Sequence, residues 1–176
     1  MKTLLKFAII LFCAMTANAE EAGFQFALTP EAAIHSTGTP IHGLTLNFVG
    51  QNEQHGLTLG IGNIMTGQSY GFSLGFVNKA DSYRGVQWGF VNCTSENYDG
   101  WMTGMVNSVG DTFTGLQLGG INYAKTSHGL QLGVINYTDN LDGLQIGAIN
   151  IATKNSWFED LPNHFAAVFP ILNWSF

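Results

Sequence analysis

Apolar and polar residues alternate along most of this chain, and the alternation is organised as a short tandem repeat. Eight copies of a unit close to Gly-Leu-Gln-Leu-Gly-x-x-Asn lie within residues 43–150, and we number the residues of this unit as positions 1 to 8. The copies start 13 to 15 residues apart, at Gly43, Gly56, Gly71, Gly85, Gly100, Gly115, Gly129 and Gly143. That period is too short for a helical hairpin and suits one strand plus one turn. The sequence therefore predicts an all-β repeat protein.

Apolar residues occupy positions 2 and 4 of the unit, and a polar residue usually separates them, as in Leu130, Gln131 and Leu132. A period of two residues predicts a strand with one apolar face and one small or polar face. Glycine recurs at position 5, Val or Ile at position 7 and Asn at position 8, each in seven copies. Polar segments such as residues 138–142 connect the copies and fit chain reversals at the surface.

Two unlike faces favour a small outer-membrane-type barrel, in which the apolar face meets lipid and glycines make room inside. We therefore expect an up-and-down meander of about ten short strands, with repeats at about 43–150 and terminal strands at about 22–28 and 164–176. The apolar run of one copy covers four steps of ~3.3 Å, or about 13 Å, which is short against an apolar band of about 25 Å. Pro170 is also awkward in a closing strand.

The alternative fold is a β-solenoid with one repeat of 14 or 15 residues in each coil. In this fold the central Gly makes a corner, Leu116, Leu118 and Ile121 point into the core, and the Asn residues stack as a ladder along the axis. The solenoid leaves a row of apolar side chains at position 6 facing water. These residues include Phe76, Phe90 and Met105.

The first nineteen residues predict a secretory signal peptide that is removed. Lys2 and Lys6 form a basic start, residues 7–15 are apolar, and Ala-Asn-Ala at 17–19 is a cleavage site. Residues 20–176 then form a single all-β domain. A lipoprotein acylated at Cys13 is an alternative, although the bulky Phe12 precedes it. We expect export to the bacterial outer membrane or cell surface, with the periplasm as the alternative.

The charge and cysteine content of the mature chain limit its partners. Four basic residues remain against 12 acidic ones, a formal charge of −8, which repels phosphate backbones and argues against nucleic acid as a partner. Cys93 is the one cysteine left, so no intrachain disulfide can form. Its expected role is that of a small buried hydrophobic residue, because no basic neighbour is evident that would activate the thiol.

We assign no catalytic, cofactor-binding or metal-binding residues from the sequence. The motifs of serine hydrolases, thiol oxidoreductases, zinc proteases and P-loop proteins are missing. In a solenoid, His42 and His55 would lie one coil apart, about 4.8 Å, but a third and fourth metal ligand are not evident. Surface polarity is the expected role of the histidines, which are His35, His42, His55, His128 and His164.

The Asn and Gln columns also have simple expected roles. An Asn that closes a strand is a turn former whose side chain bonds to the local backbone. Gln117, Gln131 and Gln145 are hydrogen-bonding fillers of the interior, with a pore lining or a sugar-binding row as alternatives.

The repeats and residues 170–176 resemble a bacterial surface-repeat family built on 14- to 15-residue Gly-Leu-Gln-x-Gly-x-x-Asn units. The final Phe176, with Trp174 and Leu172 at alternate positions, also resembles the C-terminal signature of outer-membrane barrels. The resemblance implies a surface or outer-membrane location and no defined biochemical activity. We expect a non-enzymatic protein with a structural or interaction role and outer-membrane lipid as a partner. A soluble or peripheral solenoid adhesin or ligand-binding module, a small pore and a cryptic enzyme are the alternatives.

Overall fold

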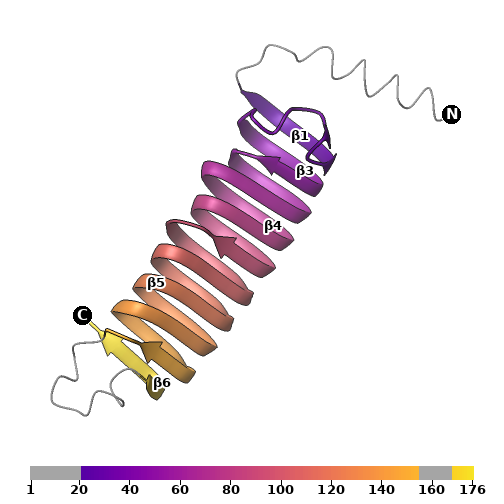
Figure 1. The fold of residues 1–176 in the computed structure, drawn as a ribbon. Coiled ribbons are helices and arrows are strands. Elements are labelled where there is room, and N and C mark those ends of the chain that lie inside the picture. Colours follow the sequence, from indigo (N-terminus) through magenta and orange to yellow (C-terminus); the bar gives the residue numbers. More distant parts are fainter. Residues whose placement is uncertain (1–20, 155–167) are drawn as a thin grey trace, which may run out of the picture.

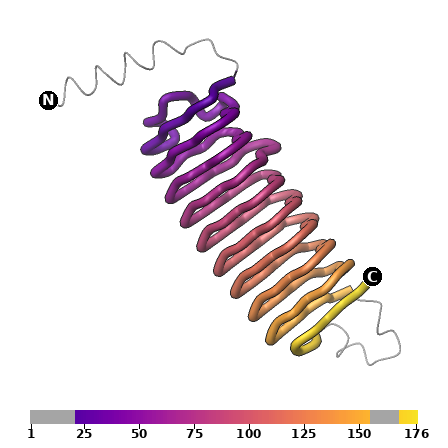
Figure 2. The backbone as a smooth tube through the Cα atoms, turned by 180° about the vertical axis from the view of Figure 1, so that it is seen from behind, coloured from indigo at the N-terminus to yellow at the C-terminus, as the bar shows by residue number. Residues whose placement is uncertain are grey.

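The computed structural model describes residues 21–154 and 168–176 and is an elongated stack of coils (Figure 1). The expected signal peptide, His164 and the first part of the expected C-terminal strand lie outside these residues. The strands are β1 (Ala22–Thr29), β2 (Ala32–Ala33), β3 (Ile41–Asn52), β4 (Gln54–Thr94), β5 (Tyr98–Ala152) and β6 (Val168–Ser175). Strands β4 and β5 are 41 and 55 residues long because extended backbone continues around several coils (Figure 2).

The coils form one sheet in the order β2-β1-β3-β4-β5-β6. Strands β1, β3, β4 and β5 pair in parallel, and the register places Leu44 beside Leu57 and Thr45 beside Thr58. Identical positions of the repeat therefore lie one above another. The all-β prediction is confirmed, but the expected barrel of about ten short strands is wrong, since neighbouring strands of an up-and-down barrel run antiparallel. The chain is a parallel β-solenoid.

The short repeat explains why the chain winds rather than closing into a barrel. An apolar run of about 13 Å cannot build the apolar band of about 25 Å that a barrel presents to lipid. A coil of the same length instead returns to its starting point and pairs its backbone with the coil before it. At the two ends, β2 pairs antiparallel with β1, and β6 pairs antiparallel with β5. Within the described residues, no helix has the length and apolar character needed to cross a membrane.

The interior of the solenoid contains an Asn ladder. Each ladder Asn donates one hydrogen bond to the Asn of the next coil at 2.8 to 2.9 Å and one to a position-4 carbonyl of that coil. The expected role of these residues as turn formers is therefore wrong. Asn150 ends the ladder by donating to the carbonyl of Phe169 in β6. The ladder comprises Asn63, Asn78, Asn92, Asn107, Asn122, Asn136 and Asn150, all buried.

The corner between positions 5 and 8 has room for a single side chain. A Cβ at Gly133 would lie 2.6 Å from the amide nitrogen of Asn122, inside the ladder. The first copy exchanges the two residues, with Asn47 at position 5 and Gly50 at position 8. A Cβ at Gly50 would overlap the Asn47 amide, and that amide donates to Asn63 at 3.3 Å. The exchange keeps one amide in the same space.

A second, incomplete amide ladder runs through position 3. Gln145 donates to Gln131 at 2.8 Å, and Gln131 donates to Gln117 at 2.7 Å. Gln117 then meets the sulfur of Met102 at 3.9 Å, where the series of amides stops. Beyond it, both polar atoms of the Gln87 side chain are buried without a hydrogen-bond partner among the described residues. Met102 therefore interrupts the ladder.

Replacing Met102 with glutamine is expected to stabilise the protein. The new amide would lie beside Gln87 in register and could bridge it to Gln117. Two buried hydrogen bonds at about 0.5 to 1.5 kcal/mol each predict a gain of about 1 to 3 kcal/mol. Urea unfolding followed by circular dichroism checks this, with Met102→Leu as the matched apolar control. A Met102→Gln protein no more stable than Met102→Leu would contradict the ladder-gap interpretation.

Aromatic rings fill the wider end of the interior. Tyr83, Tyr98 and Phe113 stack on successive coils with ring centroids 5.8 and 5.9 Å apart. The Tyr98 hydroxyl lies 2.9 Å from the Gly85 carbonyl and 2.8 Å from the Trp101 carbonyl, and it accepts a hydrogen bond from the Gln87 amide. Burial raises the pKa of the Tyr83 and Tyr98 hydroxyls, so both keep their protons at neutral pH.

Candidate interaction surface

The exterior of the coils, rather than the interior, carries the large apolar side chains of the repeat. Positions 2, 4, 6 and 7 face outward, and Phe76, Trp88 and Phe90 are 58, 57 and 50% exposed. The expectation that Leu116, Leu118 and Ile121 point into the core is therefore wrong, since the flanking Gln117 and Asn122 are fully buried. We call the outward residues of positions 2, 4, 6 and 7 the apolar surface.

Charge is completely missing from the apolar surface. Its 32 positions contain no Asp, Glu, Lys, Arg or His, and Thr103 is the one polar residue among them. Monomeric soluble proteins rarely expose a contiguous apolar patch above a few hundred Å². Eight coils at ~4.8 Å span roughly 34 Å and positions 2 to 6 span about 13 Å, so the projected area is on the order of 450 Å² before side-chain relief. The surface is therefore larger than single scattered apolar residues would make it.

The largest side chains gather at the middle of the apolar surface. Trp88 and Trp101 belong to the fourth and fifth of the eight copies, and Trp101 is 49% exposed. They line an apolar hollow of about 190 Å³. The rings of Phe76 and Phe90 stack beside it at 5.1 Å. The other residues of the hollow are Phe72, Val86 and Thr103.

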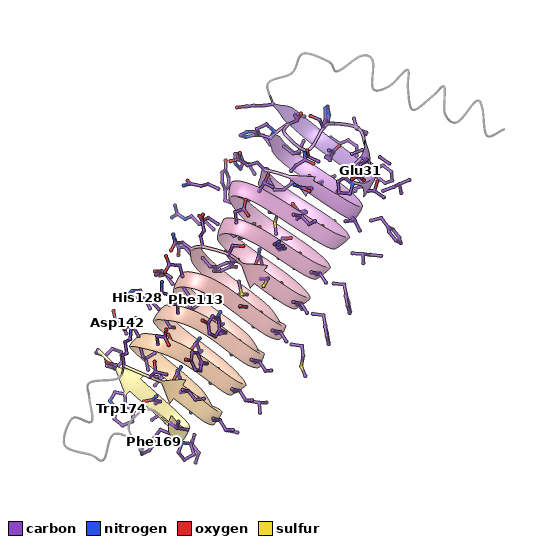
Figure 3. All side chains as sticks on the ribbon, viewed as in Figure 1. Glu31, Phe113, His128, Asp142, Phe169 and Trp174 are labelled. Atoms are coloured by element: carbon purple, nitrogen blue, oxygen red, sulfur yellow. The ribbon has the colours of Figure 1, made fainter. Side chains whose placement is uncertain are left out.

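Charged side chains occupy the opposite edge of the stack, in the turns before position 1. His128 pairs with Asp142 at 2.9 Å, and Arg84 pairs with Asp99 at 3.4 Å. Figure 3 shows His128 and Asp142 on this edge, while a row of single side chains projects from the other. The solenoid therefore has a charged edge and an apolar surface on separate sides.

His42 and His55 lie on neighbouring coils in direct register, as the solenoid alternative expected. His55 Nδ1 is 3.0 Å from His42 Nε2, and His55 Nε2 is 3.2 Å from a Glu53 oxygen. Tyr70 stacks on the His55 ring at 4.4 Å. Within residues 21–154 and 168–176, no group of three or more His, Cys, Asp or Glu residues is arranged to hold a metal ion. The cluster therefore satisfies its own polar groups.

An open groove of about 620 Å³ lies near the charged edge and includes Tyr70, Arg84 and Asp99 in its lining. The guanidinium and carboxylate of the groove already pair with each other. Cys93 is exposed on the outside of its coil, so its expected role as a buried hydrophobic residue is wrong.

Comparisons with known proteins add no identity to this geometry. No protein-family model, no curated protein and no solved structure matches the chain. What can be stated is structural: the chain is a repeat β-solenoid with coils of 13 to 15 residues and an internal Asn ladder.

Proposed function

We propose that this chain is an exported, non-enzymatic interaction module of the bacterial cell surface, and that its apolar surface is the part that binds. The observation that carries the proposal is the lack of charge at all 32 outward positions beside large exposed rings such as Trp88 and Phe76. Burial of apolar surface contributes about 25 cal/mol per Å², so a partner that covers this side gains substantial free energy.

The position of the amides supports a binding role. In most domains apolar side chains stabilise the fold from inside, but here Gln and Asn occupy the inside and bond to one another. The apolar side chains at positions 6 and 7 therefore contribute little to the core of their own molecule. Residues that a fold does not need inside, repeated over eight copies, are suited to contact with another surface.

Location and chemistry complete the proposal. The predicted signal peptide at residues 1–19 directs the chain out of the cytoplasm. The charged edge carries mainly acidic residues and does not favour nucleic acid or anionic lipid. We assign no catalytic role to the histidine cluster or to the groove. Outer-membrane lipid, expected from the sequence, is one class of partner that the following experiment detects.

Site-specific photo-cross-linking in producing bacterial cells tests the proposal. Benzoylphenylalanine at Trp88, in the full chain with its own leader, is expected to give covalent adducts with protein or lipid. The matched control is benzoylphenylalanine at Thr114, which is exposed on the charged edge. Mass spectrometry identifies the adducts, and circular dichroism verifies that both variants fold. No adduct at Trp88, or equal adducts at both sites, would show that the apolar surface is not a binding site.

A further inference from the structure

We propose that the occupant of the apolar surface is a second copy of this chain, arranged antiparallel to the first about a two-fold axis between copies 4 and 5. This inference rests on the proposed function and names its partner. Numbering the copies 1 to 8 from Gly43 to Gly143, copy n of one molecule would face copy 9 − n of the other. Position 6 would then meet position 6, and likewise for positions 2 and 4.

Side-chain size supports this arrangement, because large residues would face small ones. Trp88 of one molecule would lie over Thr103 of the other, at the rim of the apolar hollow. The remaining facing pairs follow the same rule along positions 2 and 6. They are Trp101 with Val86, Phe76 with Gly120, and Phe48 with Ala148. Interdigitation of large and small side chains gives the packing density of a protein interior.

Charge at the edge of the surface supports the same orientation. The residue before position 1 in each copy forms a charged column beside the apolar surface. In the antiparallel pair Arg84 would face Asp99, and His42 would face Asp142. A parallel pair, related by an axis along the middle of the position 2 and 4 rows, would exchange the edges and set the position-6 row against this column. That arrangement would place Phe90 over Arg84 and Ala148 over Asp142, which desolvates charge against apolar groups.

The location of the tryptophans favours a protein partner over a lipid bilayer. Trp and Arg anchors lie near the centre of protein interfaces, surrounded by less important apolar contacts. Trp88 and Trp101 occupy copies 4 and 5, at the middle of the surface, with leucines toward both ends. Proteins at membranes instead carry Trp and Tyr in belts at the water boundary.

The size of the surface suits a stable pair. Its projected area is on the order of 450 Å², and standing side chains increase the accessible area toward the roughly 800 Å² per partner of a standard interface. Both faces have the same coil spacing, so contacts repeat in register along their whole length. A two-fold axis is also the commonest symmetry of homo-oligomers and leaves no surface of this kind open for further growth.

The mass of the purified mature protein in solution without detergent tests the inference. Light scattering after size exclusion is expected to give twice the mass of one chain for the wild type. Trp88→Gln with Trp101→Gln is expected to give the mass of one chain. Tyr70→Gln is the matched control, because Tyr70 is also an aromatic residue with 49% exposure but lies on the charged edge, and it is expected to remain a dimer. Circular dichroism verifies that each variant retains its β structure.

Spin labels on the charged edge test the orientation. In a Cys93→Ser background, a label at Thr114 (preceding copy 6) would be offset by three coil steps, about 14 Å, from its mate along the axis. A label at Asp142 (preceding copy 8) would be offset by seven steps, about 34 Å. Equal distances at the two sites indicate a parallel pair and overturn the antiparallel arrangement.

The outcomes separate this inference from the proposed function. A monomeric wild type overturns the dimer, whether or not it floats with phosphatidylcholine vesicles. If the Trp88 photoprobe still forms specific adducts in cells, the binding surface stands and only the identity of its occupant is wrong. If neither dimer nor adduct forms, both proposals fail.

Discussion

Replacing Asn122 with alanine is expected to lower the free energy of unfolding by about 3 to 5 kcal/mol. The Asn122 amide accepts a hydrogen bond from Asn107 at 2.9 Å and donates to Asn136 at 2.8 Å and to the Leu132 carbonyl at 2.9 Å. All three asparagines are fully buried. Alanine would leave polar groups on both neighbouring coils without a partner, and each such group costs about 1 to 3 kcal/mol. Urea unfolding measures the change.

Asn140→Ala provides the matched control for this prediction. Asn140 is exposed in a turn, and its amide makes one side-chain hydrogen bond, to Thr126 at 3.3 Å. We expect a change within about 0.5 kcal/mol, as for most surface substitutions. If the two variants lost the same stability, the ladder would not be the source of the interior's cohesion.

Replacing Gly129 with alanine is expected to cost about 2 to 5 kcal/mol, from backbone strain and from overpacking together. Gly129 has φ of 141°, a conformation that L side chains rarely adopt. A Cβ at this site would also overlap the carbonyl oxygen of Gly115 on the preceding coil. Both effects press neighbouring coils apart, and backbone cannot swing aside as a side chain does. Thermal unfolding followed by circular dichroism measures the loss.

Gly62→Ala separates this effect from the general cost of losing glycine. Gly62 lies outside the positive-φ region, and a Cβ there would meet its nearest neighbour, a Val49 methyl carbon, at 3.4 Å. The substitution is expected to be neutral or to stabilise slightly, because alanine restricts the unfolded chain. A Gly129→Ala protein as stable as Gly62→Ala would contradict the close-approach explanation for position 1.

Alternation in the repeat predicted strands, and the structure confirms extended backbone through residues 54–94 and 98–152. The same alternation could not decide the direction of pairing. Apolar side chains outside and Gly, Gln and Asn inside fit both an antiparallel barrel and a parallel solenoid, because both enclose a narrow interior. Pairing direction depends on where the chain lies after about 14 residues, which no single unit of sequence contains.

The corner is the second feature that alternation concealed. A period of two continued through position 5 places positions 6 and 7 on opposite faces. In the coil the backbone bends there, so that Val134 and Ile135 both lie outside the buried Asn136 and Gln131. The exchange of Asn47 and Gly50 in the first copy was the available sequence signal, since two residues that trade places share one space.

The amino-acid sequence by itself determined the repeat, its period, its β character and the grouping of apolar and polar positions, because these depend on spacing along the chain. Only the tertiary structure decided that the asparagines form a hydrogen-bonded ladder, that the leucines and aromatic residues face outward, and that the tryptophans meet at the middle of one surface. Winding brings residues 13 to 15 apart into direct contact. Stacking of that kind depends on how the coil closes, and closure depends on the whole chain.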